Sequence, residues 1–172
     1  MKLLVNMEPD IQRAGGILLK GLQGGHKILV CGNGGSAADS QHFAAELIGR
    51  FEMERNAWPA IALTTDTSIL TALANDYAFS DIFARQVEGL GREGDVLVGI
   101  STSGNSDNVL QAVHTASALG MKSIGLLGKD GGCLKNAIDV PVIIPESVTA
   151  RIQEAHIFIL HYWAFFIETN MK

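Results

Sequence analysis

The sequence predicts an α/β fold: a three-layer α/β/α sandwich around a mainly parallel sheet of about five strands, wound as in flavodoxin-like or Rossmann-like folds. Short apolar runs alternate with longer stretches of helix-forming residues, which is typical of a parallel sheet covered on both faces. Two of these units also share one order: a buried strand, a turn of small polar residues and a helix. No linker or low-complexity segment divides the 172 residues, so we expect one domain.

The first element is an amino-terminal helix. Apolar side chains recur at helical spacing from Ile11 to Leu22, and Gly24 and Gly25 follow as a stop signal. We expect residues 1–25 to contribute to an oligomer interface.

The remaining elements follow from the same alternation. Apolar runs predict strands at residues 27–30, 59–63, 95–100, 123–127 and 140–144, and Pro141 favours an edge position or a strand start for the last one. Residues 64–68 are expected to cap a helix that runs to Ala74 and is broken by residues 75–77. Further helices are predicted at residues 36–50, 80–90, 107–119, 133–136 and 149–168.

Composition excludes several classes of protein. Apolar residues make up 47% of the chain and charged residues 18%, with a formal net charge of -5. An acidic balance without a basic cluster argues against a nucleic-acid partner. No apolar segment has the length of a membrane span, and the first nine residues become polar too soon for a secretory signal. Cys31 and Cys133 have no metal-site spacing, so we expect reduced thiols and a cytoplasmic location.

A glycine-rich turn follows the first strand, and it contains Asn33, Gly34, Gly35 and Ser36. Glycine lets the backbone approach a ligand closely, and the start of the next helix offers free N–H groups to an anion. The spacing matches neither a dinucleotide fingerprint nor a nucleotide P-loop. The alternative interpretation is a plain tight turn.

A second polar turn follows the strand at residues 95–100, and its hydroxyl groups come from Ser101, Thr102, Ser103 and Ser106. Both turns are expected at the carboxyl ends of parallel strands, where ligands of open α/β sheets bind. The turn has no lysine or arginine, so a phosphate would be held by hydroxyls, amides and the helix dipole. Ordinary helix capping is the alternative.

Two helices carry candidates for chemistry. His42 and Glu46 are four residues apart and share a helix face, which suits two metal ligands, an acid and a base, or an exposed polar pair. The closing helix holds Gln153, His156 and His161 in otherwise apolar surroundings. The two histidines lie on opposite sides of Gln153, so spacing does not decide which one faces a site and which one belongs to the core.

Taken together, these motifs resemble the phosphoheptose isomerases, which are sugar-isomerase (SIS) domain enzymes of bacterial heptose synthesis. The resemblance runs from about Gly25 to the end of the chain. It is carried by the segments at residues 31–36, 42–47, 75–77, 99–106, 128–132 and 151–154, together with His156 and His161.

The resemblance implies conversion of sedoheptulose 7-phosphate to D-glycero-D-manno-heptose 7-phosphate, for lipopolysaccharide core or a related glycan. It implies a homotetramer with sites at subunit interfaces, and a zinc ion held by His42, Glu46, Gln153 and His161, which selects His161 over His156. In that reaction we expect Glu46 to act as base and His161 as acid. The expected substrate contacts are Asn33, Gly34, Gly35, Ser36, Glu46, Asn75, Asp76, Ser101, Thr102, Ser103, Ser106 and Gln153.

Two departures and two alternatives accompany the resemblance. The helical region before the first glycine turn is shorter than is usual in the family, and residues 149–151 lack an acidic residue that some members carry before the arginine. One alternative is a non-catalytic SIS protein that binds the replication initiator, and the other is a SIS protein for amino-sugar phosphates. The set His42, Glu46, Gln153 and His161 favours the heptose isomerase, since a binding protein has no chemical need for it.

Overall fold

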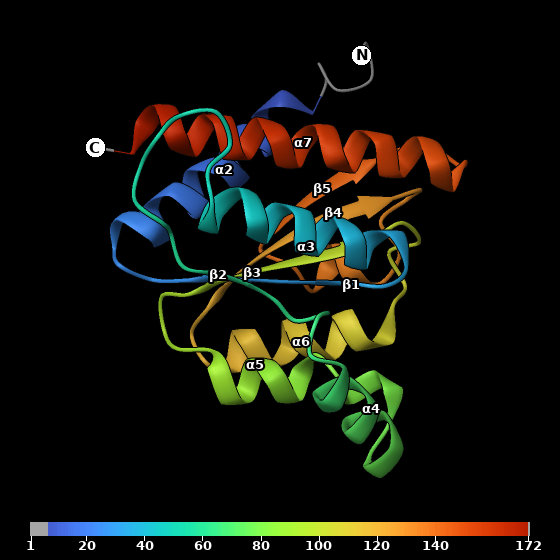
Figure 1. Ribbon diagram of the computed structural model, residues 1–172. Helices are drawn as coiled ribbons and strands as arrows, with labels where there is room; N and C mark the ends of the chain where they lie inside the picture. The colour runs from blue at the N-terminus through green and yellow to red at the C-terminus, as the bar shows by residue number, and fades with distance from the viewer. Residues whose placement is uncertain (1–6, 172) are drawn as a thin grey trace.

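The fold is a five-stranded, fully parallel sheet with the strand order β2-β1-β3-β4-β5 (Figure 1). The computed structural model describes residues 7–171, so expectations that concern residues 1–6 lie outside the described part. The strands are β1 (Ile28–Gly32), β2 (Ala60–Ala62), β3 (Val96–Ser101), β4 (Lys122–Gly128) and β5 (Val140–Ile144).

Helices cover both faces of the sheet. The α-helices are α2 (Glu8–Gln23), α3 (Gly35–Ile48), α4 (Thr67–Asp76), α5 (Ala84–Leu90), α6 (Asp107–Ala118) and α7 (Thr149–Asn170), and two 3-10 turns are η1 (Phe79–Asp81) and η2 (Leu134–Asn136). In Figure 1, α2, α3 and α7 lie above the sheet, and α5 and α6 lie below it. The predicted α/β/α sandwich is therefore confirmed.

The strand order sets the place of a ligand site. The strand order reverses between β1 and β3. From β1 the chain passes through α3, above the sheet, to β2 on one side, and from β3 it passes through α6, below the sheet, to β4 on the other side (Figure 1). In open α/β sheets this switch point is where the carboxyl ends of the strands leave a crevice. The glycine turn follows β1 and the serine turn follows β3, so both turns flank the switch point.

Apolar packing on the two faces fixes the helices. Every residue of β1 and β3 is buried, as expected for central strands covered on both sides. On the upper face Trp163 is fully buried, and its indole N–H donates to the Ile11 carbonyl at 2.9 Å, which joins α7 to α2. Gly15 faces the rings of Trp163 and Phe166, so its missing side chain lets the two helices approach closely.

Two predicted helices differ in their bounds. The Asp66 carboxylate caps α4 by accepting from the Ile69 N–H at 2.9 Å, and the helix continues through residues 75 and 76 until Tyr77. The helix therefore extends two residues past the predicted end at Ala74, and Tyr77, the last of the residues expected to break it, is its C-cap. The predicted helix at 80–90 is divided into η1 and α5, with buried Ile82 between them.

The segment from residue 133 to β5, the two cysteines and the length of the helices were also the subject of predictions. The helix predicted at residues 133–136 is the 3-10 turn η2 at residues 134–136, and β5 with Pro141 is an edge strand, as predicted. Cys31 and Cys133 are both free, and burial raises the pKa of the Cys31 thiol to about 12. Within residues 7–171, no helix is both long and apolar enough to cross a membrane.

Candidate active site

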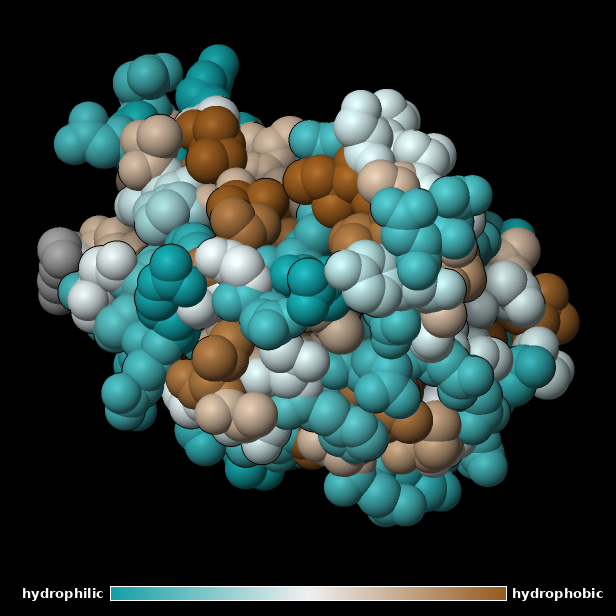
Figure 2. All heavy atoms as spheres, turned by 90° about the horizontal axis from the view of Figure 1, so that it is seen from below, coloured by the Kyte–Doolittle hydropathy of each residue, from teal (hydrophilic) through white to brown (hydrophobic). Residues whose placement is uncertain are grey.

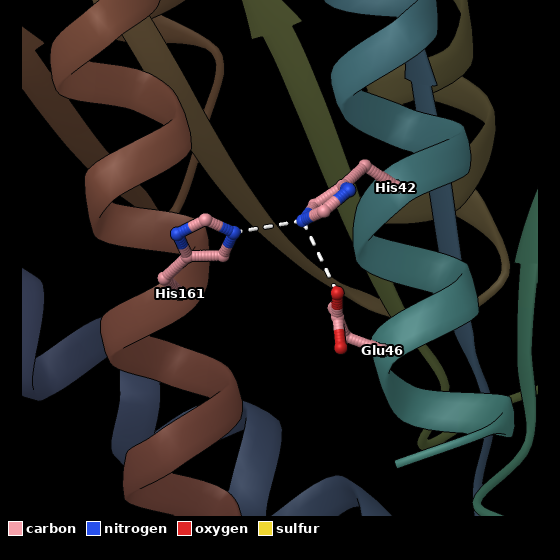
Figure 3. Close-up of side chains that lie close together, drawn as sticks. All are labelled: His42, Glu46 and His161. Atoms are coloured by element: carbon pink, nitrogen blue, oxygen red, sulfur yellow. Dashed lines mark hydrogen bonds and ion pairs between the residues drawn. The ribbon is translucent and has the colours of Figure 1, made fainter. Parts of the chain in front are cut away.

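Three ionisable side chains converge between α3 and α7. Figure 3 shows His42 and Glu46 reaching from α3 toward His161 on α7. His42 Nε2 lies 2.8 Å from His161 Nε2 and 3.2 Å from Glu46 Oε1. One ligand atom from each of the three lies within 4.8 Å of the other two. We call these three residues the His–Glu–His cluster.

The helix faces place the cluster. On α3, Phe43 and Leu47 follow His42 and Glu46 by one residue, about 100° around the helix, and are fully buried, with the Phe43 ring 6.2 Å from that of Trp163 on α7. This burial fixes the rotation of α3, so that His42 and Glu46 point toward His161. On α7, buried Leu160 and Trp163 flank His161 and fix its direction. The two imidazoles meet edge to face, with ring centroids 4.9 Å apart.

The donor set of the cluster allows two kinds of chemistry. Two imidazole nitrogens at 2.8 Å share one proton, or they bind one cation together. Two histidines and one carboxylate are also the protein ligands typical of a catalytic zinc ion, with a position left for substrate or water. The same groups offer a base and an acid within reach of one small molecule.

The two histidines of α7 have different environments. His156 is fully buried, its Nε2 lies 3.3 Å from the Leu127 carbonyl, and burial lowers its pKa to about 4. Its Nδ1 has no hydrogen-bond partner among the described residues. His161 is only partly buried and joins the cluster. The alternative that spacing left open is thereby resolved, since His156 is a core residue.

Gln153 contacts the glycine turn. Its side-chain amide occupies the space that a Cβ on Gly35 would need, so only glycine leaves room for it there. Gly35 and His42 are separated by seven residues of α3, which is about 10 Å along the helix axis. The contact observed for Gln153 is therefore with the start of α3.

The glycine turn is built to leave backbone groups free. Gly34 has a φ of 56°, a conformation that favours glycine, and no side chain caps the start of α3. Asn33 is held by two reciprocal amide hydrogen bonds with buried Asn108, each 2.8 Å long. These bonds join the turn after β1 to the first turn of α6. Gly34 and Gly35 are exposed beside it, and Ser36 is buried.

The serine turn forms a compact group of hydroxyls. Buried Ser101 lies with its Oγ 2.8 Å from Ser106 Oγ and 3.4 Å from Ser103 Oγ. The Gly104 N–H donates to Ser101 Oγ at 3.1 Å, which leaves the half-buried Thr102, Ser103 and Ser106 near the start of α6. Hydroxyls at a helix N-terminus suit an oxyanion such as phosphate.

Asn75 and Asp76 lie away from the cluster in this chain. Both are exposed on α4, where the Asn75 amide donates to the Asp76 carboxylate at 2.8 Å. In Figure 1, α4 projects below the sheet, whereas the cluster lies above it. No residue of α4 is buried. The structure thus brings these two predicted substrate contacts to a protruding helix.

Two features of the site were not identified from the sequence. Asp39 shares the face of α3 with His42 and Glu46; burial raises the pKa of its carboxyl, and its Oδ2 has no partner among the described residues. Helical spacing could have identified it. The ring of Phe51 stacks on His161, with centroids 5.4 Å apart. Its position in the loop before β2 gave no periodic signal.

Comparisons with known proteins extend over nearly the whole chain. The SIS domain family matches residues 2–128. The phosphoheptose isomerase of Geobacter metallireducens is 55% identical over 165 residues, which cover 96% of this chain and 87% of that protein. Solved phosphoheptose isomerases from Neisseria gonorrhoeae and Francisella tularensis have TM-scores of 0.91 and 0.93 at 47% and 43% identity, and each match covers 98% of this chain and 92% of the other.

Proposed function

Because the chain belongs to the phosphoheptose isomerases of the SIS domain family, we propose that it converts sedoheptulose 7-phosphate to D-glycero-D-manno-heptose 7-phosphate. The observation that carries the proposal is the His–Glu–His cluster between α3 and α7. The same chain has two turns suited to oxyanions, the glycine turn and the serine turn. The relatives described above are named as isomerases, which does not favour the replication-initiator or amino-sugar alternatives.

The phosphate is assigned to the serine turn. The hydroxyls of Thr102, Ser103 and Ser106 would donate hydrogen bonds to the phosphate oxygens. Ser101 would orient the Ser106 hydroxyl, which lies 2.8 Å from its own. The glycine turn with Asn33, Gly34, Gly35 and Ser36 would bind oxygens of the sugar through its free backbone groups. Gln153, Asn75 and Asp76 complete the proposed substrate contacts.

Glu46 and His161 are assigned the proton transfers. Glu46 would remove the proton from the carbon beside the carbonyl and return it to the neighbouring carbon, so that no proton is gained or lost overall. His161 would carry the proton between the two oxygens of the enediol. His42, at 3.2 Å from Glu46 and 2.8 Å from His161, orients both groups.

A zinc ion fits the donor set of the cluster. His42, Glu46 and His161 would hold it. The fourth ligand expected from the resemblance, Gln153, has its amide against Gly35, about 10 Å along α3 from His42, so it is assigned to the substrate and not to the zinc. When bound, zinc would polarise the substrate carbonyl and stabilise negative charge on the oxygens.

We propose a homotetramer with sites completed between subunits. A ten-residue helix without a buried residue gains little stability in an isolated chain, and α4 also carries exposed Ile69, with Tyr77 and Phe79 directly after it. Figure 2, seen from the side where α4, α5 and α6 lie, shows apolar side chains in separate groups on a mainly hydrophilic surface. Packing of α4 on another subunit would bring Asn75 and Asp76 to that subunit's site. Residues 1–25 would add to the same assembly.

We also propose that the chain acts as one domain in the cytoplasm, without a nucleic-acid partner, in heptose synthesis for lipopolysaccharide core or a related glycan. The net charge of -5 supports the absence of a nucleic-acid partner.

Incubation of the purified protein with sedoheptulose 7-phosphate tests the function. We expect NMR spectra to show an aldose phosphate forming, a chelator to reduce the rate, and added Zn²⁺ to restore it. Absence of product from a folded, zinc-loaded sample would reject the isomerase. A product rate unaffected by complete removal of metal would reject the zinc assignment alone.

A further inference from the structure

Glu168, near the end of α7, anchors the loop that follows α3. Its carboxylate accepts hydrogen bonds from the backbone N–H groups of Phe51, Glu52 and Met53 at 2.8, 2.9 and 3.0 Å. Although burial acts to raise it, these donors and Arg55 hold the pKa of Glu168 below its usual value. Its side chain is only 1% exposed, so the anchor is charged and shielded from water.

Arg55 connects the same anchor to α3. Its Nε donates to Glu168 at 3.0 Å. Its Nη2 donates to the Glu46 carbonyl at 2.7 Å and its Nη1 to the Leu47 carbonyl at 2.9 Å, so it satisfies two of the carbonyls that the end of α3 leaves free. The guanidinium also lies 3.5 Å from the ring centroid of Trp58. One buried ion pair thus joins the helix of Glu46 to the helix of His161.

The anchored loop delivers Phe51 to the cluster. Glu168 comes seven residues after His161, two helical turns along one face of α7. Because the Phe51 N–H is fixed on Glu168, its ring lies over the imidazole of His161, 5.4 Å away and inclined by 30°. The ring covers one face of His161 while the other atoms of the cluster approach its edge.

We propose that the Arg55–Glu168 pair and Phe51 position His161 for proton transfer. Phe51 restricts rotation of the imidazole, so that Nε2 stays directed at His42, and Arg55–Glu168 holds Phe51 in place. None of the three touches the reacting atoms, so they act through His161 as positioning residues. The inference depends on the acid role proposed for His161.

Steady-state kinetics of the zinc-loaded enzyme give the first test. We expect Phe51→Leu to lower kcat on the order of tenfold or more with KM changed by less than about twofold, since misplacing a catalytic group by a fraction of an ångström costs rate. Phe51→Tyr keeps the stacked ring and should restore kcat. Lys122→Gln, which breaks the exposed Lys122–Asp139 pair at the start of β4, is the matched control and should leave kcat unchanged.

Histidine NMR of the metal-free protein gives the second test and does not depend on activity. The ring current of Phe51 should displace the His161 ring protons, and Phe51→Leu and Glu168→Gln should both remove that displacement while His114 is unaffected. If Glu168→Gln does not fold, Arg55→Lys is used, because it keeps the charge and loses the fork that reaches α3.

Unchanged kcat in Phe51→Leu, no rescue by Phe51→Tyr, or unmoved His161 resonances would overturn the inference. The ring-current displacement could behave as expected while a His161→Gln variant keeps full activity. That result would reject the acid role proposed for His161, and the catalytic part of the inference with it.

Discussion

The amide pair between Asn33 and Asn108 offers a sharp test of how the glycine turn is held. Asn108→Ala removes both 2.8 Å hydrogen bonds and leaves the amide of half-buried Asn33 without its partner. Two hydrogen bonds at about 1 kcal/mol each give an expected loss of about 2 kcal/mol in the free energy of unfolding. Because Asn33 is a proposed substrate contact, we expect KM for the sugar phosphate to rise as well.

Asn108→Asp makes the same test depend on pH. The new carboxylate accepts from the Asn33 amide, but it faces the Asn33 oxygen with a second oxygen and no proton. Asn108 is buried, so burial raises the pKa of the new carboxyl in the folded protein. The aspartate therefore has a pKa near 4 in the unfolded chain and a higher pKa in the folded protein. Its protonated form contributes to the free energy of unfolding fully below the unfolded-state pKa, and this contribution is lost as pH rises through the folded-state pKa.

Urea unfolding of Asn108→Ala and Asn108→Asp at pH 4.5 and 7.5 measures both effects, each relative to the unmodified protein at the same pH. We expect the aspartate variant to be closer to the unmodified protein at pH 4.5, and the alanine variant to show no such difference. An aspartate variant as stable as the unmodified protein at pH 7.5, or an alanine variant with a loss below about 0.5 kcal/mol, would show that the pair does not hold the turn.

Three further outcomes are expected. Gly35→Ala should raise KM on the order of tenfold with an unchanged circular dichroism spectrum, because a Cβ would displace the Gln153 amide; an unchanged KM contradicts that contact. Ser101→Ala should raise KM more than it lowers kcat, since the hydroxyl orients Ser106; equal effects on both parameters would argue against a phosphate-binding role. The pKa of His156 is lowered to about 4, so its neutral form contributes stability above pH 6.5. As pH falls from 6.5 toward 4, the free energy of unfolding should decrease by roughly 3 kcal/mol for this reason, and the unfolding of His156→Leu should lack this pH dependence.

Much of the fold could be predicted because it depends on local patterns. The strands β1 and β3 are continuous apolar runs followed by small polar turns, and each pattern fits within about ten residues. The cluster of hydroxyls in the serine turn was equally local, since Ser101 and Ser106 are five residues apart and their Oγ atoms lie 2.8 Å from each other.

Other features depend on which distant segments meet. Spacing could not distinguish His156 from His161, because the difference is set by packing of α7 on β4, where the Leu127 carbonyl receives His156. Glu168 and Arg55 are 113 residues apart, and neither residue belongs to a recognisable motif. The end of α4 was misjudged by two residues, because the propensities of Asn75 and Asp76 do not fix a helix end sharply.

The proposed isomerisation depends on proton transfer by Glu46 within the His–Glu–His cluster. The most direct measurement is the isomerisation rate of Glu46→Gln, a variant of nearly the same shape, with folding checked by circular dichroism. We expect a loss of about 10²–10⁴-fold in kcat, the usual contribution of a general base. A folded Glu46→Gln enzyme that isomerises the sugar phosphate at the rate of the unmodified protein would contradict the assignment of Glu46 as the base.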